Sequence, residues 1–166
     1  MIQETTIPAA KVKQLQIVVI ALVTGVILFC LVAIFLATSY SGPTPPADTL
    51  MPLRLIHLVL CVLIIAATRI IPPMILSGKI SPRNPAGEPP SFVQKYVSAT
   101  IVHLALLEGM TLFGLVVFMT AATGGKVLID STYYLHFLPL LFFILQAKIL
   151  FPTEEKFNEL QRQYGE

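Results

Sequence analysis

Residues 16–38 read QIVVIALVTGVILFCLVAIFLAT and contain no charged side chain. About 20 consecutive apolar residues are enough for a helix to cross a bilayer, so this stretch can form a complete span. Lys11 and Lys13 precede it, as basic residues precede a secretory signal, but the apolar region of a signal is only about 7–15 residues long. We therefore expect a retained transmembrane helix over about residues 14–38.

Three further apolar runs have the same character, at about residues 53–71, 96–122 and 132–150. The first of these is expected to end before Pro72-Pro73, because proline removes a backbone donor. Lipid offers no partner to an unpaired backbone group, which favours helices, and no run alternates like a barrel strand. The sequence thus predicts an all-α integral membrane protein, with residues 1–166 forming a single membrane domain of four transmembrane helices.

The overall composition supports a lipid environment. Of the 166 residues, 55% are hydrophobic and 12% are charged, and the mean hydropathy is +0.81. Soluble domains carry about 25% charged residues. The net charge of +2 is too small for a nucleic-acid-binding surface. We expect the lipid bilayer, and not nucleic acid, to be the chain's main partner.

The basic residues indicate the orientation of the spans. Nine of the eleven Lys and Arg fall on one side, whereas Arg54 and Lys126 fall on the other. By the positive-inside rule, both termini and the connection between the second and third spans are expected in the cytoplasm, with the chain in the inner membrane. The nine are Lys11, Lys13, Arg69, Lys79, Arg83, Lys95, Lys148, Lys156 and Arg162.

The C-terminal tail, residues 151–166, has the pattern of a short amphipathic helix. Thr153 is a typical N-cap residue. Phe157, Leu160 and Tyr164 then follow at i, i+3 and i+7, on one side of a helix. We expect these three side chains to lie against the inner membrane face or to contact a partner.

Glu108 is the main candidate for a functional residue, because it lies near the middle of the third predicted span. A charged carboxylate there costs several kcal/mol unless it is neutral, paired or hydrated. Arg69 and Lys148 lie near the ends of their spans and are poorly placed to pair with it, whereas the hydroxyl of Thr111 is one turn away. Glu108 is therefore either a proton-binding group or a protonated carboxyl that hydrogen-bonds a neighbouring helix.

No catalytic set, cofactor motif or metal site is predicted. The sequence contains no phosphate loop, Ser/His/Asp set or dinucleotide fingerprint. His57, His136 and Asp130 could meet at the outer surface, but three ligands from three segments without a spacing motif are weak support for a metal site. An enzyme is the least favoured class, although the size and four spans look like the membrane-associated glutathione-transferase family.

The stretch LALLEGMTLFGLVVF, residues 104–118, resembles the carboxylate helix of the ATP-synthase c subunit, the rotary-ATPase proteolipid. In that family a Glu is followed at fixed spacing by a hydroxyl, an aromatic residue and Gly-Leu-Val-Val. Residues 83–85, Arg-Asn-Pro, are similar to the Arg-Gln-Pro loop of the family. The resemblance implies that Glu108 carries a proton and that Arg83 contacts a cytoplasmic partner.

Three classes of function therefore remain. The favoured one is a small polytopic subunit of a larger membrane assembly, in which Glu108 and Thr111 bind a proton or form a helix interface. Arg83, Phe157, Leu160 and Tyr164 would contact the other subunits. The alternative is a self-associating, proteolipid-like subunit that translocates protons, and a small membrane enzyme is the third class.

Overall fold

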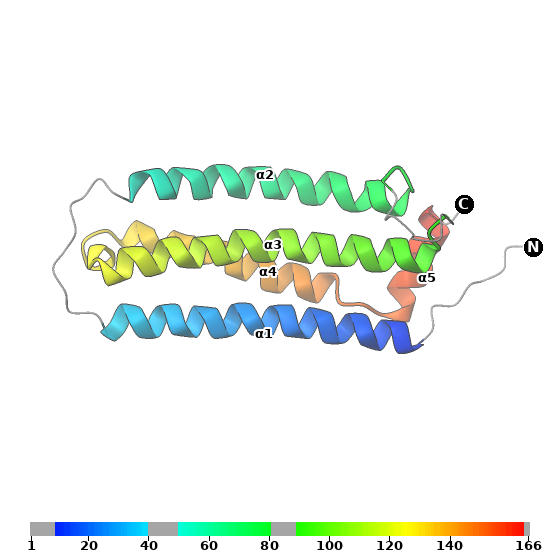
Figure 1. Ribbon diagram of the computed structural model, residues 1–166, viewed down its shortest axis with the longest axis horizontal. Coiled ribbons are helices and arrows are strands. Elements are labelled where there is room, and N and C mark those ends of the chain that lie inside the picture. Colours follow the sequence, from blue (N-terminus) through cyan, green and yellow to red (C-terminus); the bar gives the residue numbers. More distant parts are fainter. Residues whose placement is uncertain (1–8, 40–49, 81–88, 165–166) are drawn as a thin grey trace, which may run out of the picture.

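Four long helices run up and down along the molecule (Figure 1). The computed structural model describes residues 9–39, 50–80 and 89–164. The long helices are α1 (Ala9–Ser39), α2 (Met51–Leu76), α3 (Phe92–Thr123) and α4 (Leu138–Ile149), the last directly preceded by the 3-10 helix η3 (Ser131–Phe137). A one-turn 3-10 helix, η2 (Lys126–Leu128), follows α3, and α5 (Glu154–Tyr164) lies at the opposite end of the bundle. We refer to the two ends as the η3 end and the α5 end.

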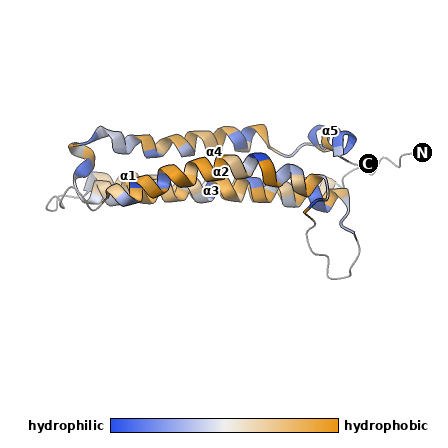
Figure 2. Cartoon of the chain, turned by 90° about the horizontal axis from the view of Figure 1, so that it is seen from above, coloured by the Kyte–Doolittle hydropathy of each residue, from blue (hydrophilic) through white to orange (hydrophobic). Residues whose placement is uncertain are grey.

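The four predicted apolar segments are confirmed as helices long and apolar enough to cross a membrane. In the fourth segment, this length combines η3 and α4, from Ser131 to Ile149. Many large apolar side chains point outward from these helices, among them Ile17, Leu58 and Leu141, each more than 60% exposed. Figure 2 shows hydrophobic residues along the whole length of the helices. Such extensive apolar exposure is unusual in water and is what a lipid-facing surface requires.

Helix α3 is the centre of the bundle. It contacts α1, α2, η3 and α4, and α4 also contacts α1. Figures 1 and 2 show α1, α3 and α2 side by side in one layer, with α4 lying on one side of that layer. The fully buried Leu107 and Leu115 of α3 pack in one cluster with Val26 of α1 and Phe143 of α4. The other side of α3 is left uncovered by the described part of the chain.

The sequence predicted that the second helix ends at Ile71. In the structure, α2 continues through Pro72-Pro73 to Leu76. Proline inside a helix costs about 3 kcal/mol or more in a soluble protein, but it is better tolerated where neighbouring helices support the backbone. Here Ile75 and Leu76 are buried in a cluster that also contains Tyr96 of α3. Burial of this last turn therefore opposes the local preference of the two prolines.

The beginning of the fourth segment also differs from the expected continuous helix. Residues 131–137 form the 3-10 helix η3, and the α-helix begins at Leu138. Pro139 is in the first turn of α4, where its missing N–H removes no helical hydrogen bond. The Asp130 side chain accepts a hydrogen bond from the backbone N–H of Thr132 and so caps η3.

The ends of α3 follow from recognisable local signals. Ser91 caps its N-terminus: the Ser91 hydroxyl accepts from the backbone N–H of Gln94, and the Gln94 side chain accepts from the backbone N–H of Ser91. The helix ends at Thr123, one residue beyond the predicted end at about 122 and directly before Gly124-Gly125. Gly125 has a φ of +69°, a conformation that other residues rarely adopt.

The predicted C-terminal helix is confirmed as α5, and Thr153 caps it by accepting from the backbone N–H of Lys156 at 3.3 Å. The side chain of Phe157 is fully buried, and its ring centre lies 5.4 Å from those of Phe92 and Tyr96. The apolar side of α5 therefore packs against the chain's own α3. The half-buried Leu160 and Tyr164 pack against the same cluster.

Candidate functional site

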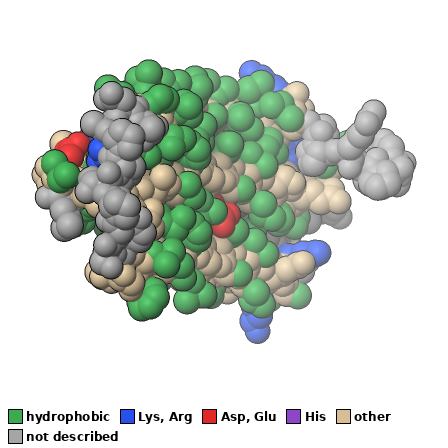
Figure 3. Space-filling view, turned by 60° about the vertical axis from the view of Figure 1, so that its left-hand side comes forward, with side chains coloured by type: hydrophobic (Ala, Val, Ile, Leu, Met, Phe, Trp, Pro, Cys, Tyr) green, Lys and Arg blue, Asp and Glu red, His purple; other side chains and the backbone are tan. Residues whose placement is uncertain are grey.

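Glu108 lies in the middle of α3, at the edge of its uncovered side. Leu104, one turn before Glu108, is buried in the bundle. Ala105, three residues before Glu108, and Gly109, directly after it, are exposed. Glu108 itself is half-buried. Figure 3 shows an acidic side chain in the middle of a largely hydrophobic surface, and Glu108 is the only acidic residue within the four apolar helices.

The uncovered side of α3, which we call the open face, consists of exposed residues spaced along the helix. Gly109 belongs to the open face. Thr111 does not, because it lies two residues further along, about 200° around the helix, and points toward α4. The members of the open face are Ile101, Ala105, Gly109, Val116 and Thr120, with Glu108 at the edge.

The structure gives Glu108 no cationic partner among the described residues. Among the described residues, the one ion pair joins Arg54 and Asp130 at the η3 end, with Arg54 Nη1 3.0 Å from Asp130 Oδ2. No hydrogen bond of the Glu108 carboxyl to another described residue is formed either. Glu108 is thus a carboxyl group at mid-helix, half-exposed on an apolar surface, whose hydrogen-bonding capacity is unused by the described chain.

Thr111 does not act together with Glu108 in this structure. Its side chain is fully buried, and its hydroxyl lies 2.8 Å from the carbonyl oxygen of Leu107 and 3.2 Å from that of Pro139. The Thr111 hydroxyl therefore connects α3 to the start of α4.

The glycines of α3 differ sharply in their surroundings. A Cβ atom at Gly109 would meet nothing within 4 Å. At Gly114 it would lie 2.8 Å from His57 Nε2 and 2.9 Å from the carbonyl oxygen of His136. Gly114 therefore lets an internal neighbour approach α3, whereas Gly109 leaves room for a neighbour from outside the chain.

His57 of α2 and His136 of η3 form a buried pair next to Gly114. Their Nδ1 atoms are 2.7 Å apart, and His57 Nε2 lies 3.4 Å from Cys61 Sγ. A bond between two Nδ1 atoms requires one of them to carry a hydrogen and the other to accept it. Of the three residues that the sequence suggested could meet, the structure thus brings His57 and His136 into direct contact.

Asp130 does not join the histidines, so the three residues considered as metal ligands are not brought together. Asp130 instead binds Arg54 and Thr132, and Arg54 lies over the ring of Tyr133 at 4.6 Å. Hydrogen bonds from Thr132, and to a smaller extent Arg54, hold the pKa of Asp130 below its usual range. Across the described residues, no cluster of three or more His, Cys, Asp or Glu suited to a metal ion occurs.

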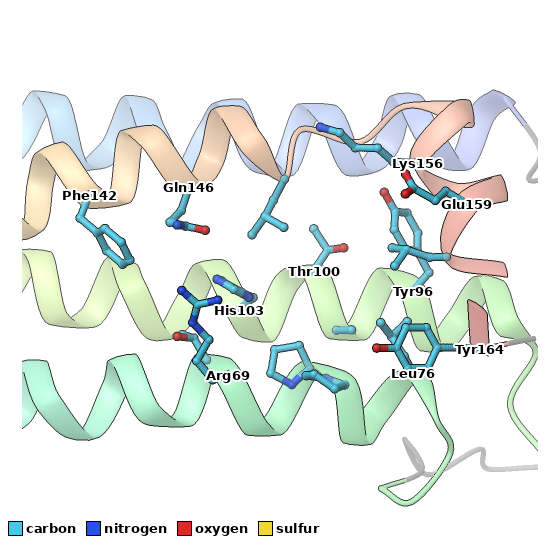
Figure 4. A pocket seen from close by; sticks show the side chains of 16 residues that line it. Arg69, Leu76, Tyr96, Thr100, His103, Phe142, Gln146, Lys156, Glu159 and Tyr164 are labelled. Atoms are coloured by element: carbon cyan, nitrogen blue, oxygen red, sulfur yellow. The ribbon is translucent and has the colours of Figure 1, made fainter. Parts of the chain in front are cut away.

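Two neighbouring cavities lie between α2 and α4, on the other side of α3 from the open face, and we refer to them together as the groove. Near the α5 end it forms a cavity of about 470 Å³, into which Arg69 of α2, His103 of α3 and Gln146 of α4 extend (Figure 4). Toward the η3 end it forms a second cavity of about 660 Å³, lined mostly by apolar side chains. Phe142 lines both cavities. The sequence does not reveal this groove, because no local spacing connects residues on three different helices.

Arg83, which the sequence predicted to contact a partner, lies outside the described residues. Of the other predicted contact residues, Phe157 is buried inside the chain, while Leu160 and Tyr164 are half-buried beside it. The latter two also line the end of the groove cavity near α5.

No protein-family model, no curated protein and no solved structure matches this chain.

Proposed function

We propose that this chain is a small subunit of a larger membrane assembly and that its open face binds a transmembrane helix of a different subunit. The observation that carries the proposal is Glu108, a half-buried carboxyl in the middle of an apolar helix with no donor from the described chain. Ionisable groups at that depth are costly and usually face a partner or a water-filled space. A donor from a neighbouring subunit would remove this cost.

The small residues beside Glu108 support close contact with another helix. Ala105 and Gly109 are four residues apart and exposed, and nothing lies within 4 Å of a Cβ atom at Gly109. Small residues at this spacing allow two helix backbones to approach in a membrane. When the two backbones approach closely, a donor side chain of the partner helix can reach the Glu108 carboxyl and hydrogen-bond to it.

The partner is proposed to be a different subunit because the open face has no cation to offer to a second Glu108. A second copy meeting the same face would place one Glu108 carboxyl against another, with no cation in either open face. A different helix with an Arg, Lys, hydroxyl or amide side chain supplies the missing donor. This proposal includes no catalytic step.

The proposed orientation places the α5 end in the cytoplasm, with the chain in the inner membrane. Lys11, Lys95, Lys156 and Arg162 are at or near this end, and only Arg54 and Lys126 are near the η3 end. A bias of this kind favours the cytoplasmic side.

The alternative is a proteolipid-like oligomer that translocates protons. It is favoured by the pattern of residues 104–118 together with the half-exposed position of Glu108 at mid-helix. This alternative requires many copies of this chain in one assembly, and it requires Glu108 to gain and lose a proton.

Native mass spectrometry of the protein extracted gently from its own membrane tests the proposal. We expect one or a few copies bound to larger, different subunits. A complex containing many copies of this chain alone would overturn the proposal in favour of the proteolipid alternative. Labelling of Glu108 by dicyclohexylcarbodiimide, which reacts with protonated carboxyls in lipid, would then be the next measurement.

A steric variant makes the test specific for the open face. Gly109→Leu adds a side chain where the chain itself leaves space, so the isolated protein is expected to keep its fold and to lose its partner. Ala66→Leu is the matched control, because Ala66 is exposed on α2 and lies about 200° around that helix from the buried Thr68. Retention of the partner by Gly109→Leu would contradict docking at this face.

A further inference from the structure

The part of the groove nearest the α5 end combines polar side chains from three helices. Arg69, His103 and Gln146 line the same cavity of about 470 Å³, and in Figure 4 all three extend into the space between their helices. Ligand sites typically have volumes of about 300–1,000 Å³ and a few convergent polar groups in an apolar wall. This cavity meets both criteria.

Arg69 is a cation without an acidic partner in the described chain. It lies seven residues before the end of α2 at Leu76, about 10 Å into the bundle at 1.5 Å per residue. In Figure 4 its side chain extends across the cavity toward His103, and not along α2 toward the α5 end, as it would in order to reach the membrane surface. The five N–H donors of its guanidinium therefore face the cavity.

The other charged groups at the cavity lie at its α5 end. Lys156 donates hydrogen bonds from Nζ to the carbonyl oxygens of Ile149 and Phe151, at the C-terminal end of α4. Glu159 of α5 lines the same end of the cavity and forms no ion pair with Arg69 in the described structure. The deeper part of the cavity is thus left with donors and no anion.

Beside this polar region lies the second, mostly apolar cavity, which is open on the outer side of the helices. The second cavity, of about 660 Å³, extends along α2 toward the η3 end, and Phe142 borders both. Most of its wall is apolar, and its polar members are Arg54, His57, Thr132 and His136. The apolar part includes Leu55, Leu58, Ile65, Leu135 and Leu138. A ligand that fills both cavities therefore needs a polar head at Arg69 and a long apolar chain.

We propose that this groove binds a lipid with an anionic phosphate head group, with the phosphate at Arg69 and the hydrocarbon chain along α2. Arginine binds phosphate through two parallel hydrogen bonds. A phosphate monoester has three terminal oxygens, so it can also accept from His103 and Gln146, whereas a carboxylate has only two. The site lies on the other side of α3 from Glu108, so it is independent of the docking proposed above.

Native mass spectrometry of the detergent-purified protein, titrated with dioleoyl phosphatidate, tests this proposal. Dioleoyl phosphatidylcholine is the matched neutral lipid, and inorganic phosphate tests the head group without the chain. We expect phosphatidate to bind at least about tenfold more tightly than phosphatidylcholine and to resist competition by inorganic phosphate. Equal binding of the two lipids, or displacement of phosphatidate by inorganic phosphate at equal concentration, would overturn the proposal.

Variants of Arg69 locate the site. Arg69→Gln is expected to weaken phosphatidate binding about tenfold, which corresponds to about 1.4 kcal/mol. Lys148→Gln is the matched control, because Lys148 is an exposed cation on α4 that does not line the groove cavities. Arg69→Lys keeps the charge but loses the pair of parallel hydrogen bonds, so it should bind phosphatidate with intermediate affinity. This second variant tests the site if Arg69→Gln does not fold. Unchanged binding by a folded Arg69 variant would rule out this site.

Discussion

The imidazole rings of His57 and His136 are joined by a hydrogen bond between their Nδ1 atoms, which lie 2.7 Å apart inside the bundle. The bond connects α2 to η3 through two residues that are 79 positions apart in the sequence. Both side chains are buried, so neither nitrogen has bulk water as an alternative partner. The pair therefore contributes to holding the η3 end of the bundle together.

Removal of one histidine should cost more than removal of both. His57→Leu or His136→Leu alone leaves a buried nitrogen without its partner, which costs about 1–3 kcal/mol. The double variant leaves none, so we expect the two changes to be non-additive by about 0.5–3 kcal/mol. Chemical unfolding of the four proteins in the same detergent measures this coupling. Strictly additive single effects would show that the hydrogen bond does not form.

Gly114→Ala should disturb the same region through packing. The new Cβ atom would lie 2.8 Å from His57 Nε2 and 2.9 Å from the carbonyl oxygen of His136. The second of these atoms belongs to the backbone, which cannot move aside as a flexible side chain can. Overpacking of this kind typically costs about 1–3 kcal/mol. Gly109→Ala is the control, since its Cβ atom meets nothing within 4 Å and alanine favours a helix by up to about 1 kcal/mol. Thermal unfolding should show opposite shifts for the two variants.

The apolar segments could be predicted from the sequence, because their length and lack of charge are local properties. The end of α2 could not, since the local signal of Pro72-Pro73 is opposed by the burial of Ile75 and Leu76 against other segments. The arrangement of the helices was also hidden. The residues of α1 are almost uniformly apolar, so their pattern does not indicate which side faces α3.

The candidate site could be predicted only in part, for a related reason. Glu108 stands out because a single carboxyl in an apolar helix is rare. Arg69, His103 and Gln146 meet only through the packing of three helices, so no spacing in the sequence connects them. Thr111 was associated with Glu108 by its distance along the helix, but the structure directs its hydroxyl to the Leu107 and Pro139 carbonyls.

The hydrogen bonds from Thr132 and the ion pair with Arg54 should together make Asp130, and with it the η3 end, sensitive to acid. Hydrogen bonds from Thr132 and the nearby Arg54 lower the pKa of Asp130 in the folded state. A lowered pKa means that the ionised carboxylate stabilises the fold above the unfolded pKa of about 3.9, and that this contribution is lost as the pH falls through the folded value. The melting temperature in detergent, measured from pH 6 to pH 3, should therefore decrease as the pH is lowered.

Asp130→Asn separates this contribution from that of the other carboxyl groups. The variant should melt below the native protein at pH 6, and the difference should shrink as the pH falls below about 3.9. Arg54 lies over the Tyr133 ring as well as beside Asp130, so part of its packing remains in the variant. A difference between the two proteins that stays constant with pH would contradict a role for the ionised carboxylate.

Phe157→Ala should release α5 from the bundle. The Phe157 side chain is fully buried between the rings of Phe92 and Tyr96, and truncation of a buried phenylalanine typically costs about 3–5 kcal/mol. Because α5 is short, with most of its other residues exposed or half-buried, we expect this loss to appear locally, as faster amide hydrogen exchange over residues 154–164. Asn158→Ala changes an exposed neighbour and should leave the exchange unaltered. Unchanged exchange in Phe157→Ala would mean that Leu160 and Tyr164 suffice to hold α5 against α3.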